Sequence, residues 1–354
     1  MCDGRDMKNG FDLPGRLMNG YTVHATRRKR IILPVCLQPS EFVSPTIQFG
    51  VDSRMPPPVA ATSKVSMVIS HASMKANSAA SDYALGNTDA EHERLIRQAK
   101  WLATPTERCF REAGIGQGQC VLDLGSGVGD VTLLLARIVG PAGEVVGVER
   151  DPRSIARAKS RVAEAGLHNV RFTQSDVSQI SNDKPFDAAV GRYILMFLPD
   201  PIGVLRSLAR LIRPGGVLAF QEPCWDSFLL HAARLPLWSV GAFLMVETFK
   251  RSGANTGMGA ALSRIFQEAG LPAPSTRMDT LFGAEEWMPD VLRSLRPQFL
   301  QFNLPFESLG DFDTLSQRLQ AEVAATDMRT PLPDLVSAWC RKPERVPSQQ
   351  SSTT

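Results

Sequence analysis

The stretch that most constrains the fold of this chain is residues 121–130, which read VLDLGSGVGD. Apolar and β-branched residues lead into a bend that holds three glycines. A second apolar run, residues 131–139, follows the bend and has the character of a helix. We therefore expect a buried strand, a glycine-rich bend and a helix, an arrangement that brings backbone amides close to a bound ligand.

The three glycines of the bend have separate expected roles. Gly125 can adopt the φ values that a tight turn requires. Gly127 lacks the Cβ atom that would keep a ligand at a distance, and Gly129 should let the new helix pack closely on the sheet. The spacing is G-x-G-x-G, whereas the dinucleotide fingerprint is G-x-G-x-x-G. Its third glycine would fall at residue 130, which is Asp130.

Two acidic residues in this stretch suggest the charge of the ligand. Asp123 stands two residues before the first glycine, and Asp130 follows the last one. Both carboxylates would repel a pyrophosphate, but they suit a ligand that carries an ammonium and a sulfonium group.

With these residues, VLDLGSGVG resembles the first motif of the class I S-adenosylmethionine-dependent methyltransferases. The whole stretch from residue 83 to residue 343 is similar to the small-molecule, quinone-biosynthesis-like group of that family. The resemblance implies S-adenosyl-L-methionine as cofactor and a Rossmann-like sheet of seven strands, the last of them antiparallel.

Strand and helix patterns alternate along the chain, which predicts an α/β fold with a doubly wound parallel sheet. Helices should begin at the Asp-Pro steps 151–152 and 200–201. By the resemblance, a sixth and an antiparallel seventh strand follow at 276–282 and 335–341. The five expected parallel strands are residues 120–124, 143–149, 169–176, 186–193 and 217–221.

The remaining segments divide the chain into regions. Residues 1–82, which include the basic cluster RRKR, should form a disordered or non-core extension. A helical cap should occupy residues 83–114, with one helix over 91–102 and a second that starts at Thr104-Pro105. The cofactor-binding core spans 115–223, an acceptor-side region with a helical lid spans 224–334, the last strand spans 335–343, and 344–354 form a flexible tail.

Ligands of such sheets bind beyond the carboxyl ends of the strands. Glu149, about twenty residues after the bend, is placed to reach two ribose hydroxyls. The resemblance implies that Asp176 and the Val177 amide meet the adenine, and that Arg192 faces cofactor and acceptor together. In the cap, Tyr83 and Gln98 either touch the ligand or pack on the surface. The expected cofactor-binding residues are Asp123, Gly125, Ser126, Gly127, Glu149, Asp176, Val177 and Arg192.

Methyl transfer is an in-line displacement, which depends mainly on alignment and the exclusion of water. It has no universal catalytic residue, so only candidates for a general base can be named: Tyr193, Glu222 and His231, with Asp226 nearby. A lone histidine among apolar residues is more often a packed one.

The acceptor is expected to be a small, apolar or aromatic metabolite. Residues 223–252 are apolar and rich in aromatic side chains, and 191–194 lack the (Asp/Asn)-Pro-Pro-(Tyr/Phe) run of amide and nucleobase N-methyltransferases. A net charge of +3 gives no reason to expect a nucleic acid partner. The element that is methylated and the oligomeric state stay open. Two alternatives also remain: an NAD(P)-dependent oxidoreductase, and a non-catalytic relative that binds the cofactor.

Cysteines and hydropathy bound the environment of the protein. The six cysteines are scattered without a CxxC pair, which argues against a metal site or disulfide framework and fits a reducing compartment. No apolar segment follows a basic start, so we expect a cytoplasmic protein. The most apolar window, residues 229–249, contains charged residues and a proline, which argues against a membrane span.

Overall fold

The structure is a computed structural model and describes residues 85–86, 88–180, 184–283 and 286–344. The predicted extension over residues 1–82, Tyr83 and almost all of the predicted C-terminal tail lie outside the described residues.

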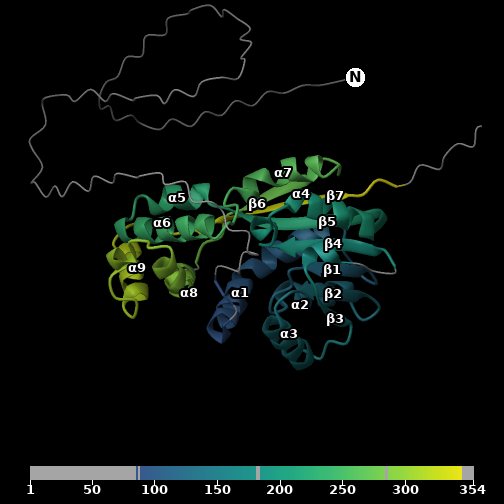
Figure 1. The fold of residues 1–354 in the computed structure, drawn as a ribbon, viewed down its shortest axis with the longest axis horizontal. Coiled ribbons are helices and arrows are strands. Elements are labelled where there is room, and N and C mark those ends of the chain that lie inside the picture. Colours follow the sequence, from purple (N-terminus) through teal and green to yellow (C-terminus); the bar gives the residue numbers. More distant parts are fainter. Residues whose placement is uncertain (1–84, 87, 181–183, 284–285, 345–354) are drawn as a thin grey trace, which may run out of the picture. The chain divides into compact units, whose positions relative to one another are not determined.

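The described residues form one seven-stranded sheet with the order β3-β2-β1-β4-β5-β7-β6. The first five strands are parallel, and β7 runs antiparallel to both of its neighbours. The predicted α/β sheet with an antiparallel last strand is therefore confirmed (Figure 1). The strands are β1 (Cys120–Leu124), β2 (Glu144–Glu149), β3 (Val170–Gln174), β4 (Phe186–Arg192), β5 (Ile212–Cys224), β6 (Ser275–Asp279) and β7 (Asp334–Arg341).

Helices cover both faces of the sheet because side chains of successive strand residues point to opposite faces. Val121 of β1 packs in a cluster with residues of α1 and α2, whereas Leu122 packs in a second cluster with residues of α4 and α7. The helices around the sheet are α1 (Asp89–Glu112), α2 (Asp130–Val139), α3 (Pro152–Glu164), α4 (Pro201–Leu211) and α7 (Met258–Glu268), with short 3-10 turns η1 (Val177–Gln179) and η2 (Leu195–Phe197).

Two helix starts follow the predicted capping chemistry. The carboxylate of Asp151 accepts a hydrogen bond from the Ser154 amide at 2.8 Å, and that of Asp200 accepts one from the Gly203 amide at 2.8 Å. In both cases a proline follows the capping residue, where its missing N–H costs nothing.

The N-terminal cap differs from the prediction. Residues 89–112 form one continuous helix, α1, with Thr88 as its N-cap and Pro105 inside it. The prediction of a second helix that starts at Thr104-Pro105 was therefore wrong. The buried stripe of Leu102, Pro105, Cys109 and Phe110 continues across the proline at helical spacing. Packing of this stripe outweighs the backbone hydrogen bond that a proline removes.

The acceptor-side region contains α5 (Asp226–Ala232) and α6 (Pro236–Arg251) before β6, and α8 (Trp287–Gln301), η3 (Phe306–Leu309) and α9 (Leu315–Ala324) between β6 and β7. The predicted helical insertion before the last strand is thus present, with α8 longer than its sequence pattern indicated. In Figure 1 these four helices lie together beyond one end of the strands, with α1 between them and the sheet.

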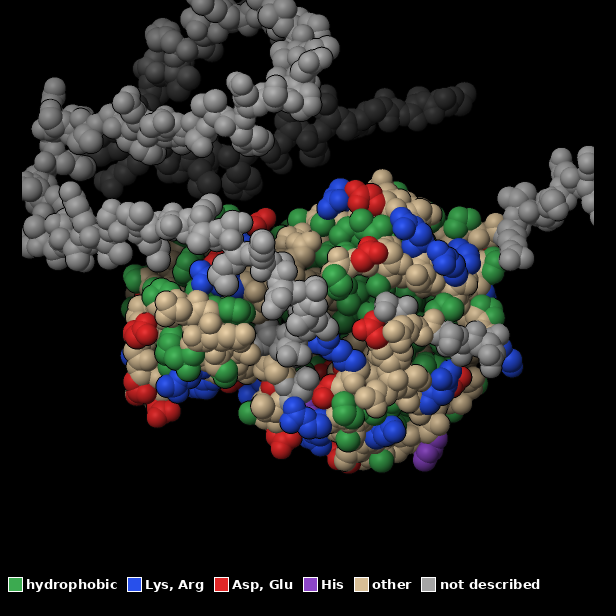
Figure 2. All heavy atoms as spheres, viewed as in Figure 1, with side chains coloured by type: hydrophobic (Ala, Val, Ile, Leu, Met, Phe, Trp, Pro, Cys, Tyr) green, Lys and Arg blue, Asp and Glu red, His purple; other side chains and the backbone are tan. Residues whose placement is uncertain are grey.

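The described helices and the visible surface bear on whether the chain could cross a membrane and on how its charges are distributed. Among the described helices, none combines the length and apolar character that crossing a membrane would require. On the face seen in Figure 2, basic and acidic side chains both occur, with apolar and uncharged surface between them.

Candidate active site

One cavity lies at the carboxyl ends of the five parallel strands. Each strand contributes a lining residue at or just after its end: Gly125, Glu149, Asp176, Arg192 and Trp225. Helices α1 and α8 also contribute lining residues. This convergence follows from the parallel topology, since all five strands end at the same edge of the sheet.

Most of the expected site residues line this cavity. Seven of the eight expected cofactor-binding residues do so: Gly125, Ser126, Gly127, Glu149, Asp176, Val177 and Arg192. Tyr193 and Gln98 line it too, but Asp123, Glu222 and His231 are not among the lining residues.

The glycine bend is open toward the cavity at Gly127. This residue has φ +50°, and a Cβ atom placed on it would meet no atom within 4 Å. Gly125, by contrast, has φ +65° and leaves a Cβ only 2.6 Å from a methyl carbon of Ile194. At Gly129 the closest contact would be Ala158 on α3, at 3.2 Å, so this glycine serves helix–helix rather than helix–sheet packing.

The carboxylate of Glu149 fastens the bend to the turn after β2. Its Oε2 accepts a hydrogen bond from the Gly127 amide at 3.0 Å. Its Oε1 accepts from the amides of Arg150 and Asp151 at 2.8 and 3.0 Å. Three backbone donors therefore fix the orientation of a partly buried carboxylate at the rim of the cavity.

Asp123 lies beneath the bend instead of facing the cavity. It is buried and accepts a hydrogen bond from the Thr132 hydroxyl of α2. Burial raises the pKa of its carboxyl to about 7, although the Thr132 hydrogen bond and the Arg192 charge act in the opposite direction. Its expected place beside the ligand therefore differs from its place in the structure, where it braces the first turn of α2.

Asp130 lines the cavity but has a cationic partner. The Arg161 guanidinium of α3 lies 2.7 Å from its carboxylate, and both side chains are largely buried. The negative charge that the sequence places in the bend is thus partly neutralised within the protein. The other acidic lining residues, Glu149 and Asp176, lie at the ends of β2 and β3 rather than in the bend.

Two lining residues have polar groups that bear on ligand binding. The Oγ atom of Ser126 is buried and has no hydrogen-bond partner among the described residues. Arg192 donates a hydrogen bond to the Thr106 hydroxyl of α1 at 3.0 Å. Burial lowers the pKa of this guanidinium, and the nearby Asp130 carboxylate counteracts the shift.

Tyr193 is held in an unusual backbone conformation directly after β4. Its φ is +57°, a left-handed conformation that is unfavourable for a bulky side chain and costs about 1–3 kcal/mol. Its amide donates to the Gln221 carbonyl at 2.8 Å, which holds the turn in place. Burial raises the pKa of the Tyr193 phenol above its ordinary value, so the side chain stays neutral.

Glu222 and His231 occupy structural positions. The Glu222 carboxylate is fully buried and accepts hydrogen bonds from the amides of Ile194 at 3.0 Å and Leu195 at 2.7 Å, at the start of η2. Nδ1 of His231 bonds to the Ser227 carbonyl at 2.8 Å, one turn earlier in α5. Neither side chain lines the cavity, so Tyr193 is the one of the three predicted candidates for a base that does.

We expect Glu222→Gln to flatten the dependence of stability on pH. Burial raises the pKa of Glu222 from 4.5 to about 8, against the effect of the backbone hydrogen bonds. A raised pKa means that folding favours the protonated form. The resulting stabilisation is complete below pH 4.5 and is lost as the pH rises through 8, with a slope of at most about 1.4 kcal/mol per pH unit.

Denaturant unfolding of wild type and Glu222→Gln across this pH range measures the effect. The variant cannot titrate at this position, so its free energy of unfolding should fall less steeply. If the free energy of unfolding fell equally steeply with pH in both proteins, the raised pKa of Glu222 would be contradicted.

The roof of the cavity is a polar network between α1 and α8. Arg94 forms a buried, bidentate ion pair with Glu91, with both N–O distances 2.7 Å. A further nitrogen of Arg94 donates to Oε1 of Gln98 at 2.7 Å, and the same oxygen accepts from the Trp287 indole at 2.9 Å. Gln98 thereby joins the cap to the insertion through two donors.

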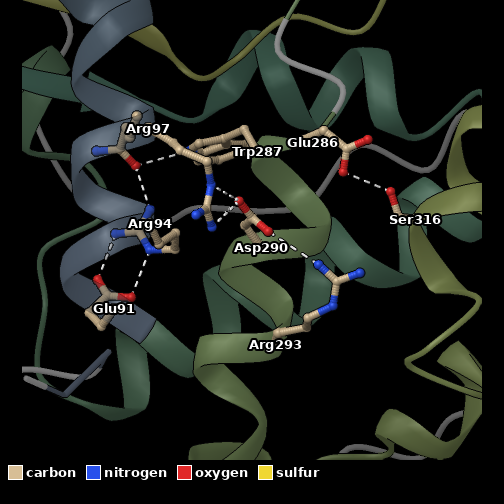
Figure 3. A network of polar contacts seen from close by, with 9 residues as sticks. Glu91, Arg94, Arg97, Glu286, Trp287, Asp290, Arg293 and Ser316 are labelled. Carbon is tan, nitrogen blue, oxygen red and sulfur yellow. Dashed lines mark hydrogen bonds and ion pairs between the residues drawn. The ribbon is translucent and has the colours of Figure 1, made fainter. Parts of the chain in front are cut away.

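A second contact between these helices lies nearer the surface. Asp290 of α8 accepts from Arg97 of α1 at 2.8 Å and from Arg293 of its own helix at 3.1 Å (Figure 3). Figure 3 shows the Glu91–Arg94 and Arg97–Asp290 ion pairs, with Trp287 beside them. The sequence held no signal for this contact, because nothing in the periodicity of α1 shows which helix it meets.

The other half of the cavity is apolar and aromatic. Trp225, Phe249 and Trp287 line it, whereas Phe228 and Trp238, which are also buried, do not. The six described lining residues that follow β5 are all uncharged: Trp225, Phe249, Ser252, Trp287, Val291 and Pro333. Each acidic lining residue, namely Asp130, Glu149 and Asp176, belongs instead to the β1–β3 side.

The comparison with protein families bears directly on this arrangement. Residues 115–270, from β1 through α7, match the family model of a methyltransferase domain. These residues form a methyltransferase domain. Both helices of the roof, α1 and α8, lie outside the matched part of this methyltransferase domain.

The curated proteins that are similar to this chain include methyltransferases named for different substrates. The chain is 30% identical to a demethylmenaquinone methyltransferase of Geobacillus stearothermophilus over 38% of this chain and 59% of that protein. It is 32% identical to an arsenite methyltransferase of Halobacterium salinarum over 31% of this chain and 28% of that protein. Each alignment spans less than two thirds of the relative's own length.

Among solved structures, a methyltransferase from Aquifex aeolicus that depends on S-adenosylmethionine superposes with a TM-score of 0.37. It is 21% identical, and the match covers 50% of this chain and 83% of that one.

Proposed function

We propose that this protein transfers a methyl group from S-adenosylmethionine to a small, uncharged acceptor that binds in the aromatic half of the cavity. The observation that carries the proposal is the division of one cavity into a polar half at the strand ends and an apolar half formed after β5. The first half suits a nucleoside cofactor, and the second suits an apolar metabolite.

The residues of the polar half fit the cofactor. Gly127 leaves open space where a Cβ would stand, so the backbone can approach the ligand closely. The buried Ser126 hydroxyl has no hydrogen-bond partner among the described residues, and a bound ligand can supply one. In this proposal Glu149 accepts hydrogen bonds from the ribose hydroxyls, and Asp176 with the Val177 amide binds the adenine.

When bound, the cofactor supplies a methyl group on a sulfonium, which the acceptor atom displaces in line. The chain's own contribution is to align the two molecules and to exclude water. Trp287, held by Gln98, and the apolar residues of η2 wall off the acceptor side. Because the Tyr193 phenol stays protonated, we assign it hydrogen bonding to the acceptor rather than proton removal.

Cavity chemistry favours an aromatic acceptor over arsenite. Soft ions are bound by thiolates, yet no described cysteine lines the cavity. Burial raises the thiol pKa of Cys109 to about 12 and that of Cys340 to about 11, so both stay protonated. The arsenite relative is therefore a poorer guide to the acceptor than the relative that methylates demethylmenaquinone.

Titration calorimetry with S-adenosylhomocysteine and with NADH tests the proposed cofactor. We expect micromolar or tighter binding of S-adenosylhomocysteine and no measurable binding of NADH. The reverse result would make the protein an oxidoreductase on a similar sheet. Incubation with methyl-labelled cofactor and a panel of aromatic acceptors then tests turnover, and its absence across the panel would favour a non-catalytic relative.

A further inference from the structure

Trp225 has a buried hydrogen-bond donor that the protein does not use. The side chain is 5% exposed and lines the cavity just beyond the end of β5. Its indole Nε1 is buried and has no partner among the described residues. Burial of an unsatisfied N–H is unfavourable, so such a donor calls for an explanation, and a ligand that accepts the hydrogen bond is one.

Comparison with neighbouring tryptophans makes this donor distinctive. The indole of Trp287 donates to Gln98 at 2.9 Å, and that of Trp238 donates to the Leu319 carbonyl at 3.1 Å. Both partners lie within the protein, so these two rings have packing or positioning roles. Trp225 is the one of these three whose N–H has no partner among the described residues, and its side chain lines the cavity.

The rings around Trp225 form a wall suited to a flat molecule. Its ring centroid lies 5.5 Å from that of Phe249 and 6.3 Å from that of Trp287. All three side chains line the cavity, and the described lining residues after β5 carry no charge. Aromatic faces favour planar apolar ligands, and an uncharged wall disfavours ionic ones.

On the basis of the proposed methyl transfer, we propose that the acceptor is a neutral, planar ring compound with an oxygen at its edge that accepts the hydrogen bond from Nε1 of Trp225. Trp225 is then a specificity-determining residue. The aromatic wall fixes the plane of the acceptor, and the hydrogen bond from Trp225 to its edge oxygen restricts its rotation within that plane. Such a contact discriminates well because a ligand without the oxygen leaves the buried N–H unpaired.

The test compares two probes of similar shape, 2-acetylnaphthalene and 2-isopropylnaphthalene, of which only the first has a hydrogen-bond acceptor. Equilibrium dialysis measures the affinity of each for the protein saturated with S-adenosylhomocysteine. We expect wild type to prefer the ketone by about fivefold to tenfold, the gain from one hydrogen bond to a neutral group. In Trp225→Phe, which keeps a ring but loses the donor, this preference should fall to about one.

Phe249→Leu is the matched control, because it removes an aromatic side chain from the same wall without removing a donor. It should weaken binding of both probes and leave the ratio of their affinities unchanged. Failure of both probes to bind wild type would overturn the planar acceptor, and an unchanged ratio in Trp225→Phe would overturn the role of its N–H. Failure of S-adenosylhomocysteine itself to bind would instead reject the proposed function.

Discussion

Replacing Gly127 with valine should lower the affinity for S-adenosylhomocysteine by about 100-fold or more, or about 3 kcal/mol. A Cβ at this position meets no protein atom within 4 Å, so the substituted side chain extends into the space proposed for the ligand. The loss should therefore appear as lost binding in calorimetry, while the cavity walls remain in place.

Valine at a positive φ also strains the backbone, and a control has to separate that strain from the blocked site. Gly166, just beyond α3, provides it: its φ is +64°, a Cβ there also meets nothing within 4 Å, and it does not line the cavity. Gly166→Val should lose comparable stability and keep its affinity. Equal losses of affinity in both variants would show that the effect of Gly127→Val is general destabilisation.

Glu149→Ala should weaken cofactor binding by about 1–3 kcal/mol, or about fivefold to 150-fold, the loss expected for charge-assisted hydrogen bonds. The structure adds a second expectation. Because the same carboxylate accepts from the amides of Gly127, Arg150 and Asp151, its removal should also lower the free energy of unfolding. Calorimetry with S-adenosylhomocysteine and denaturant unfolding measure the two effects separately.

Glu144→Ala is the matched control for Glu149→Ala. Glu144 begins the strand that Glu149 ends, and its carboxylate forms an exposed ion pair with Arg171 at 2.6 Å. Removal of such a pair typically costs only about 0–1 kcal/mol of stability. If Glu144→Ala weakened the cofactor as much as Glu149→Ala, the site would not be at the carboxyl edge.

The sheet and the position of the cavity could be predicted from the sequence because they depend on local patterns. Apolar strands alternate with helices, the glycine bend and two Asp-Pro caps mark where helices begin, and parallel topology brings the strand ends together. Exact strand ends were harder to predict. β5 was expected to stop at residue 221 but extends to Cys224, since its pairing with β7 continues that far.

Because β5 ends three residues later than predicted, different residues lie at its end from those that the sequence indicated. Glu222 now lies inside the strand, where it is buried, and Trp225 takes the place just beyond the end. Asp123 on β1 illustrates the same difficulty two strands away from β5. Sequence spacing locates a carboxylate near a strand end, but the face to which it points depends on the packing of α2, where Thr132 binds it.

The contacts between α1 and α8 have a consequence for the protein during its synthesis. Arg97 and Asp290 are 193 residues apart in the chain, and Gln98 and Trp287 are 189 apart. A ribosome completes the glycine bend and its strands long before it reaches α8, so a nascent chain presents an uncovered pocket. Premature termination before α8 would remove this cover and also β7, the strand that joins β5 to β6 in the sheet.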